Sequence, residues 1–341
     1  MKRTTAYLVE AEKIEFVDEE IRALADDEML IRNIAVGMCH TDLPPYLGET
    51  EIARDVYPFA TMRRGVKYPA ILGHEPIAVV EEVGSRVTKF KPGDIITGLI
   101  TSAYTTHIIC KVDGLVKVPK MEKRLEYCLG EPLSCIVNIV RAAAPEYGDC
   151  VAVVGCGMMG LMIMSGLRSA GLKCMIGIDL RDDRLEDAKK YGATHVVNPK
   201  KEDVQQRCYD ITEGNGCDVV VEITGGLKGL NTACSIVRIA ERYTYKGRGK
   251  ILIPSMYGRE EMWDPNIGYN LMLRGPILHS THPMYGMDIE DNVRKGVAGY
   301  INGTLPMDEM MTHEYPFEKL NEAMDLMKSG DPSYKKGVIL F

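Results

Sequence analysis

Three short segments in the first part of the chain each place a metal-binding side chain beside a glycine. They are GMCHTD at 37–42, GHEP at 73–76 and GEPLSC at 130–135. One cysteine and one histidine alone would be read more simply as core residues, but the three segments in this order favour a metal site. A thiolate, an imidazole and a carboxylate leave a fourth zinc position open, which is typical of catalytic zinc. The candidate ligands are Cys39, His74, Glu75 and Glu131.

A second feature is the stretch VAVVGCGMMGLMIM at 151–164. No charged side chain occurs from Cys150 to Leu167, a length of 18 residues that just reaches that of a membrane span. The glycines favour another reading, because they follow the order G-x-G-x-x-G after a β-branched run and before an apolar helical run. Such a turn brings backbone N–H groups close to a pyrophosphate. We predict a dinucleotide site, against a plain buried strand-helix unit, formed by Gly155, Gly157, Met158, Met159 and Gly160.

The segment KCMIGIDLRDDR predicts a second strand that ends at Asp179, 24 residues after Gly155. A carboxylate at this place can accept hydrogen bonds from the adenosine ribose and would repel a 2′-phosphate, which favours NAD over NADP. Arg181 and Arg184 argue against this preference for NAD. Either could pair with a 2′-phosphate, or both could form a solvated basic rim beside two aspartates.

These features need two domains to position them, and 341 residues with 45% apolar content suffice for two cores. From 145 to 282, short apolar runs alternate with helical patterns, which predicts a parallel sheet covered on both faces. Residues 1–144 carry strand-like runs punctuated by Gly, Pro and Asp and predict a β-rich domain. Polar helices and a final strand are expected from 283 to 341. The expected fold class is α/β.

Taken in order, these segments resemble the zinc-dependent medium-chain dehydrogenase/reductase family, within it the alcohol, polyol and threonine dehydrogenase branch. The matching segments span essentially the whole chain: GMCHTD, YPAILGHEPIAVVEEVGSRVTKFKPGD, GEPLSC, VVGCGMMG and DVVVEITG. The resemblance implies a GroES-like catalytic domain at 1–144, a doubly wound Rossmann domain at 145–282 and a C-terminal return to the first domain at 283–341. It implies an enzyme that transfers a hydride between a secondary alcohol and NAD.

The resemblance also implies roles for single residues. Glu131 would hold the third zinc position, with Glu75 as an alternating ligand or a neighbour of the ligands, and which of the two completes the site stays open. The other roles are zinc ligation for Cys39 and His74, orientation of His74 for Asp42, the alcohol proton for Thr41 and the adenosine ribose for Arg184.

Two departures from the family pattern change what is expected. The stretch IITGLITS lacks the four clustered cysteines with which many relatives hold a structural zinc, so we expect one zinc. At Pro44 many relatives carry the histidine that ends the proton relay, and proline cannot titrate. The relay would then end in water, in the ribose hydroxyls or at another side chain such as His40.

His74 follows Cys39 by 35 positions, a longer spacing than the family usually shows. The extra length lies at 43–67 and carries polar side chains, which favours a polyol, sugar or sugar-derived alcohol; a solvated surface loop is the plainer reading. Arg63 and Arg64 could also face a phosphate on the substrate. The side chains that could offer hydrogen bonds are Tyr46, Glu49, Glu51, Arg54, Asp55, Tyr57, Arg63 and Arg64.

Two other functions compete with this interpretation. A zinc-free quinone or enoyl reductase would share the fold but generally lacks the paired Cys and GHE segments. A non-catalytic structural-zinc protein would need a closed set of four nitrogen or sulfur ligands.

Composition narrows the partners. A net charge of −7 and a pI near 5.6 argue against nucleic acid or an anionic membrane surface. The first residues, MKRTTAYLVEAEKIEF, lack the apolar stretch of a secretory signal, so a cytoplasmic location is expected. The apolar strands expected near KILIPSMY and PILHSTH would leave an exposed sheet edge, which predicts a homodimer or homotetramer.

Overall fold

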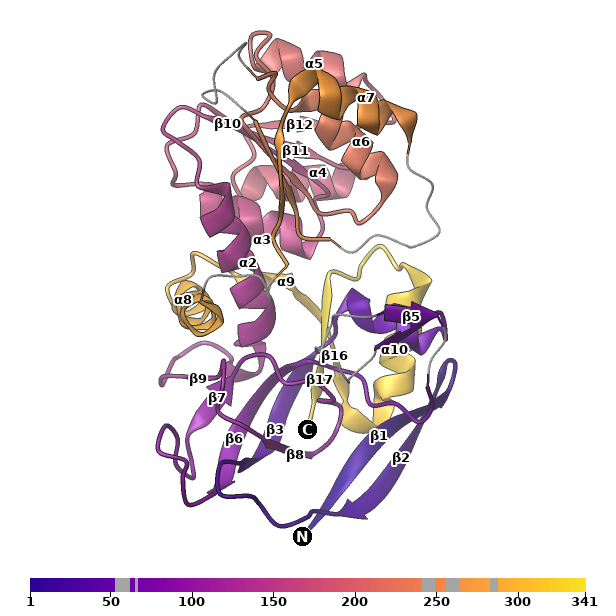
Figure 1. The fold of residues 1–341 in the computed structure, drawn as a ribbon, viewed down its shortest axis with the longest axis vertical. Coiled ribbons are helices and arrows are strands. Elements are labelled where there is room, and N and C mark those ends of the chain that lie inside the picture. The colour runs from indigo at the N-terminus through magenta and orange to yellow at the C-terminus, as the bar shows by residue number, and fades with distance from the viewer. Residues whose placement is uncertain (53–61, 65–66, 241–248, 256–263, 283–287) are drawn as a thin grey trace. The chain divides into compact units, whose positions relative to one another are not determined.

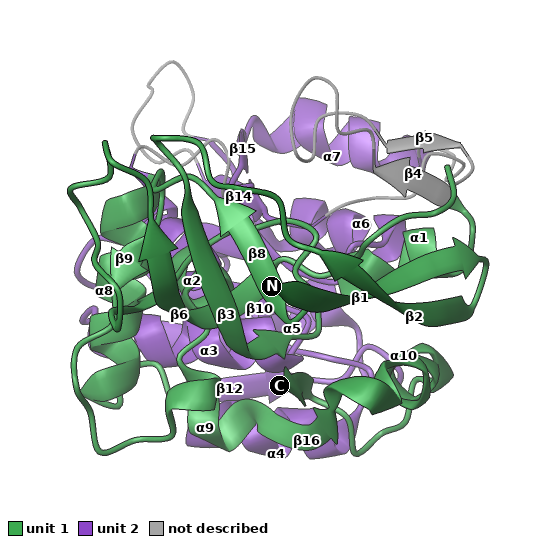
Figure 2. Ribbon diagram, turned by 90° about the horizontal axis from the view of Figure 1, so that it is seen from below, with its two compact units in different colours: residues 1–134, 289–341 green, residues 135–288 purple. Residues whose placement is uncertain are grey.

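The computed structural model describes residues 1–52, 62–64, 67–240, 249–255, 264–282 and 288–341. The chain forms two compact units, one of Met1–Ser134 with Ile289–Phe341 and one of Cys135–Asp288 (Figure 2). Their limits differ from the expected ones at 144 and 282. Helix α2 (Gly130–Ala143) is the reason at the first limit, because it is one continuous helix that crosses from the first unit into the second.

The first unit is built on a seven-stranded sheet in the described residues, with the order β16-β17-β3-β6-β7-β9 and β8 paired to β3 (Figure 1). Two further pairs, β1-β2 and β4-β5, form small sheets of their own. The strands are β1 (Lys2–Glu10), β2 (Lys13–Glu20), β3 (Met29–Gly37), β4 (Thr50–Ile52), β5 (Met62–Arg64), β6 (Glu75–Val83), β7 (Ile95–Thr97), β8 (His107–Cys110), β9 (Val116–Lys117), β16 (Met311–Pro316) and β17 (Lys336–Leu340).

Helix α10 (Leu320–Ser329) packs on the apolar core of this unit. Leu320, Ala323, Met324 and Met327 repeat at helical spacing and are all buried in the same cluster as strand β3. The remaining helical elements are α1 (Leu43–Tyr46), α8 (Ile289–Ile301), α9 (Met307–Met310) and three short 3-10 turns at His40–Asp42, Leu125–Tyr127 and Phe317–Lys319.

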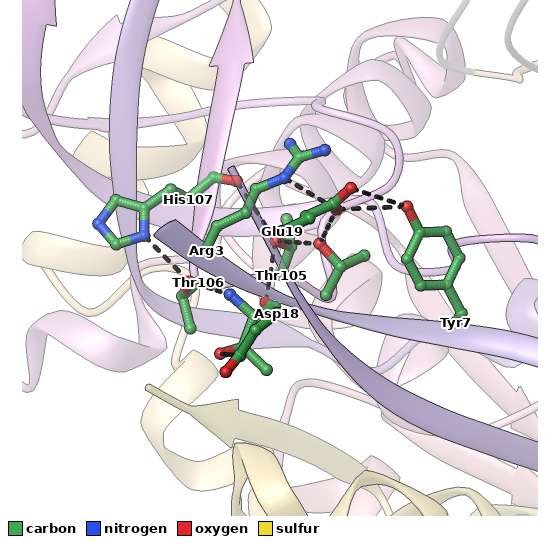
Figure 3. Close-up of polar contacts among 9 residues, drawn as sticks. Arg3, Tyr7, Asp18, Glu19, Thr105, Thr106 and His107 are labelled. Carbon is green, nitrogen blue, oxygen red and sulfur yellow. Dashed lines mark hydrogen bonds and ion pairs between the residues drawn. The ribbon is translucent and has the colours of Figure 1, made fainter. Parts of the chain in front are cut away.

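A polar network fastens the β1-β2 hairpin to the segment that leads into β8 (Figure 3). The Glu19 carboxylate accepts hydrogen bonds from Arg3 Nε at 3.0 Å and Thr5 Oγ1 at 2.6 Å. The Thr5 and Thr105 hydroxyls lie 3.0 Å apart, and Thr106 Oγ1 accepts from the backbone N–H of the residue after Arg3 at 3.0 Å. The hairpin is therefore tied to residues 105 and 106 by side chains as well as by backbone.

The second unit is an open sheet of six parallel strands in the described residues, ordered β12-β11-β10-β13-β14-β15. Strand order reverses beside β10, which is the arrangement of a doubly wound dinucleotide-binding fold. Helices α5, α6 and α7 pack together, and α3 packs with α4. The elements are β10 (Cys150–Val154), α3 (Met158–Leu167), β11 (Cys174–Ile178), α4 (Asp182–Lys190), β12 (His195–Val197), α5 (Val204–Ile211), β13 (Val219–Glu222), α6 (Leu227–Ile236), β14 (Lys250–Ile253), α7 (Pro265–Arg274) and β15 (Ile277–Ser280).

The predicted α/β class with a β-rich first part and a parallel sheet is confirmed. Each apolar run proposed as a strand between 145 and 282 forms one, and β10 and β11 are buried at every position because helices cover both faces of a parallel sheet. Within the described ranges, no helix combines the length and the apolar character that crossing a membrane would require. The apolar stretch after Cys150 is instead a strand, a turn and a ten-residue helix.

Candidate metal centre and nucleotide turn

The structure brings Cys39, His74 and Glu75 together, with one ligand atom of each within 4.8 Å of the others. Cys39 follows strand β3, and His74 and Glu75 stand at the start of β6. Strands β3 and β6 are antiparallel with Gly37 opposite Glu75, so the end of one strand meets the beginning of the other. No second group of three such residues occurs within the described ranges.

Gly37 makes room for this arrangement. A Cβ atom at Gly37 would lie 2.0 Å from Glu75 Oε2 and 2.6 Å from Leu129 Cδ1, far inside contact distance. The close approach of the Glu75 carboxylate therefore requires a glycine at position 37. A turn conformation does not, because Gly37 is not among the residues with a positive φ.

His74 is oriented by a buried carboxylate. Its Nδ1 lies 3.4 Å from Asp42 Oδ1, and both residues are buried, at 6% and 1% exposure. Burial lowers the pKa of His74, but the charges of Asp42 and Cys39 outweigh it and raise that pKa well above the ordinary value. Since Nδ1 faces Asp42, Nε2 is the nitrogen that would bind a metal.

Glu75 forms a buried ion pair with Lys336 of strand β17. Lys336 Nζ lies 2.5 Å from Glu75 Oε2 and donates to the Met38 carbonyl at 2.8 Å. Only 3% of Lys336 is exposed. Burial lowers its pKa, yet the charges of Glu75 and Cys39 raise it overall, so the ammonium stays charged. The pair neutralises one of the two candidate carboxylates.

Glu131 is buried in the first turn of α2 but does not join the three-residue group. The start of α2 is attached close to β6, because Gly130 N donates to Thr97 Oγ1 and that hydroxyl donates to the Pro76 carbonyl, both at 2.8 Å. Glu131 and Glu75 therefore both stay candidates for the third zinc ligand.

Thr41 lies beside the group. Its Oγ1 donates to Cys39 Sγ at 3.1 Å from within the short 3-10 turn His40–Asp42. Thr41 is half-buried, so its hydroxyl touches a ligand sulfur without being enclosed in the core.

The donor set fits zinc. A cysteine sulfur, an imidazole nitrogen and a carboxylate oxygen are the three ligand types that zinc accepts, and three protein ligands leave one position open.

The G-x-G-x-x-G turn has the geometry that its glycines predicted. Gly155 has a φ of +104°, and a Cβ at Gly160 would lie 2.0 Å from the Gly155 carbonyl oxygen. Gly157 is the extended N-cap of α3, and Met158 and Met159 begin that helix. The first N–H groups of a helix have no acceptor within it, so they point toward whatever lies beyond the turn.

Asp179 braces this turn from the end of β11. Its Oδ2 accepts from Cys156 N at 2.8 Å and its Oδ1 from Arg181 N at 3.0 Å. Arg184 Nη1 lies 3.8 Å from Asp179 Oδ2, and the Arg181 guanidinium bonds to Asp183. The carboxylate predicted for the ribose thus also holds the backbone of the phosphate turn.

Two family models match this chain, one in each half. Residues 25–120 match the alcohol dehydrogenase GroES-like domain, and residues 159–259 match the zinc-binding dehydrogenase family. The chain belongs to the zinc-dependent medium-chain dehydrogenase family. This confirms the resemblance that the sequence segments indicated.

The chain is similar to several proteins that are named as dehydrogenases. The L-threonine 3-dehydrogenase of Pyrococcus abyssi is 28% identical over 362 residues, covering 96% of this chain and 94% of the relative. The sorbitol dehydrogenase of Bacillus subtilis is 27% identical over 330 residues, covering 88% and 86%. The solved structure of 2R,3R-butanediol dehydrogenase from Bacillus subtilis has a TM-score of 0.80 at 22% identity, covering 99% of each chain.

One predicted substrate contact of the dehydrogenase is wrong. Tyr46 is fully buried, and its hydroxyl bonds to Asp325 Oδ1 at 3.0 Å and to the Glu12 carbonyl at 3.3 Å. Its phenol therefore serves the core. Of the residues proposed with it, Arg54, Asp55 and Tyr57 lie outside the described residues. Glu51, Arg63 and Arg64 are described by their backbone alone, in β4 and β5, and Glu49 is exposed.

Sequence analysis did not identify Lys336 or Tyr104 as part of the site. Lys336 lies 261 residues from Glu75 along the chain. Tyr104 is fully buried and donates from its hydroxyl to Asp42 Oδ2 at 3.4 Å. Neither belongs to a segment with a recognisable pattern; only the pairing of distant strands brings them here.

Proposed function

We propose that this dehydrogenase oxidises a polar secondary alcohol with NAD, using one zinc ion held by Cys39, His74 and a carboxylate from Glu131 or Glu75. The observation that carries the proposal is the group of Cys39, His74 and Glu75, in a chain that also has a dinucleotide turn. Three protein ligands would leave a fourth zinc position open. A polyol, a sugar or a sugar derivative, phosphorylated or not, is the substrate class. The relatives named threonine, sorbitol and butanediol dehydrogenase support it, because each name denotes a hydroxylated substrate with a second polar group.

The residues of the chain would divide the work as follows. Zinc supplies Lewis-acid stabilisation of the negative charge on the alcohol oxygen, and the nicotinamide ring supplies the hydride acceptor. Asp42 keeps the His74 imidazole in one orientation and one tautomer. Thr41, in contact with Cys39, would accept the alcohol proton at its Oγ1 while its own proton passes outward.

The final proton acceptor of this route is water, a ribose hydroxyl or His40. Pro44 offers no titratable group. His40 is exposed next to Thr41, and its ring meets the Tyr334 ring edge-on with 5.8 Å between centroids.

We expect NAD to be used with a kcat/KM above that for NADP, because the Asp179 carboxylate would face the 2′ position. Replacing Asp179 by Asn should lower the NAD:NADP ratio of kcat/KM by about tenfold, since it removes a charge equivalent to one or two kcal/mol of repulsion at about the same volume. Asp182→Asn, three residues on in an exposed position, is the control and should leave the ratio unchanged. Equal or better turnover of NADP by the unaltered enzyme would refute the preference.

Turnover of a polyol series should exceed that of 2-propanol and 2-butanol, and we expect a difference of at least about tenfold in kcat/KM. A site that bonds hydroxyl groups rejects analogues without them because its own polar groups are left unpaired. A clear preference for the simple alcohols would remove the polar-substrate proposal. Shortening the chain between 50 and 66 tests separately whether that segment selects the substrate.

We expect a homodimer or homotetramer assembled through strand β15. Every residue of β15 is exposed, including Ile277 at 45% and Leu278 at 44%, and the strand pairs on one side with β14. An apolar edge strand favours pairing with a second copy. Changing Ile277 and Leu278 to Lys should reduce the mass in solution to that of one chain, whereas Met272→Lys on helix α7 should not; a monomeric unaltered protein would contradict the proposal.

A cytoplasmic location and a small-molecule partner, with no nucleic acid and no membrane, complete the proposal. The acidic net charge and the ten cysteines, among which the structure forms no disulfide bond, support it.

A further inference from the structure

The carboxylate that orients His74 is itself held from two sides. Asp42 Oδ1 faces His74 Nδ1 at 3.4 Å and accepts from Gly73 N at 3.3 Å. Asp42 Oδ2 accepts from the Tyr104 hydroxyl at 3.4 Å. Within the described part of the chain, this phenol is the one donor to Oδ2 of a carboxylate that is 1% exposed. A buried carboxylate oxygen depends on its donors, because water does not replace them.

The Tyr104 ring is fixed against the backbone that carries the ligand. Gly73 has a φ of +84°, and a Cβ there would lie 3.0 Å from the ring, so the glycine before His74 allows the ring to pack flush against the chain. The backbone N–H of Tyr104 donates to the Leu72 carbonyl at 3.1 Å, and its carbonyl accepts from Ala6 N at 3.0 Å. The backbone of Tyr104 is therefore held on both sides, by Leu72 and by Ala6.

The residues that follow Tyr104 anchor it further. Thr105 and Thr106 belong to the network with the β1-β2 hairpin, in which the Thr105 hydroxyl meets Thr5 and the Thr106 hydroxyl accepts a backbone N–H (Figure 3). These bonds hold the backbone next to Tyr104, whose ring is fully buried against Gly73. Together they keep its hydroxyl beside Asp42.

The hydroxyl holds its proton firmly. Burial and the nearby charges of Asp42 and Glu75 raise the pKa of Tyr104 well above its ordinary value. Packing alone would be served equally by phenylalanine. The Tyr104 hydroxyl therefore needs a separate explanation, because it belongs to a fully buried ring and points at a buried carboxylate.

We propose that Tyr104 is a positioning residue of the metal centre, whose hydroxyl fixes the Asp42 carboxylate and, through it, the His74 imidazole in the orientation that binds zinc. The inference rests on the proposed function for the identity of the metal. Removal of the hydroxyl frees Oδ2, lets the Asp42 carboxylate rotate and loosens His74. Loss of a partner behind a ligand typically costs 10-fold to 100-fold in metal affinity.

The test is zinc affinity, measured by competition with a chromophoric chelator, in full-length Tyr104→Phe and in a matched control. Tyr46→Phe is that control, because it also removes a hydroxyl bonded to an aspartate from a fully buried ring of the same core. Tyr104→Phe should weaken zinc binding by at least about 10-fold, and Tyr46→Phe by less than about 2-fold. The visible spectrum of the cobalt-substituted protein should change in Tyr104→Phe alone.

A double-variant cycle separates positioning from packing. In an Asp42→Asn background, Tyr104→Phe should cost little further zinc affinity, because the carboxylate through which the phenol acts is gone. Additive losses, unchanged affinity in Tyr104→Phe, or equal losses in the two Tyr→Phe variants would overturn the proposal. Should Tyr104→Phe not fold, the cobalt spectrum of Asp42→Asn decides: a spectrum like that of the unaltered protein overturns it. Failure of the unaltered protein to bind zinc would instead refute the proposed function.

Discussion

Replacing Lys336 by Met should lower the free energy of unfolding by about 3 to 5 kcal/mol, the usual cost of removing one partner from a buried ion pair. The Glu75 carboxylate, 1% exposed, would be left without the cation that balances it, and the Met38 carbonyl would lose its donor. Methionine retains the length of the side chain, so the loss reflects the charge more than a cavity. Denaturant unfolding of the metal-free protein measures it.

Two further variants isolate the charge effect. The double variant Lys336→Met with Glu75→Gln removes both charges and should recover most of the stability lost in the single variant. Lys328→Met breaks an ion pair with Glu12 of the same 2.5 Å length, but with side chains 37% and 46% exposed. A surface pair contributes little, so the change should be much smaller. The account of the buried pair fails if Lys336→Met costs no more than Lys328→Met.

Replacing Cys39 by Ala should reduce bound zinc from one per chain to almost none and lower kcat/KM by more than about 100-fold. The loss should exceed that caused by removing a partner behind a ligand, because a ligand atom itself is gone. Zinc content by metal analysis and the rate of NADH formation, taken on the same samples, check both parts.

Cys110→Ala is the matched control. Cys110 is also half-buried and in the same unit, on strand β8, but it is not part of the metal group. It should keep its zinc and its turnover. Full zinc retention and activity in Cys39→Ala would show that the metal lies elsewhere or is not needed.

Local patterns carried most of what the sequence predicted. The strands between 145 and 282 are short, apolar and β-branched, and the glycines of the phosphate turn are required by a positive φ at Gly155 and by contact with backbone at Gly160. Cys39, His74, Glu75 and Glu131 became candidates through the order of three short segments and the family resemblance, and the structure brings the first three together. The conformation of such residues is determined by neighbours within a few positions along the chain.

The rest depends on contacts between distant segments. Lysine is rarely buried, so nothing in SYKKGVILF indicated that Lys336 would be enclosed beside Glu75. Tyr46 looked like a substrate contact because it is polar and follows the metal segment, whereas α1 turns its ring into the core toward Asp325. Burial of an amphipathic side chain is decided by tertiary packing, which a periodic pattern of four residues cannot show.

The most direct test of the central claim is a zinc titration of the metal-free enzyme, followed as the rate of NADH formation from a polyol. The account predicts no turnover without metal, a rate that rises in proportion to added zinc, and saturation at one zinc per chain. Turnover that is unaffected by zinc, or that saturates only at two zinc ions per chain, would contradict a single catalytic zinc at Cys39, His74 and a carboxylate.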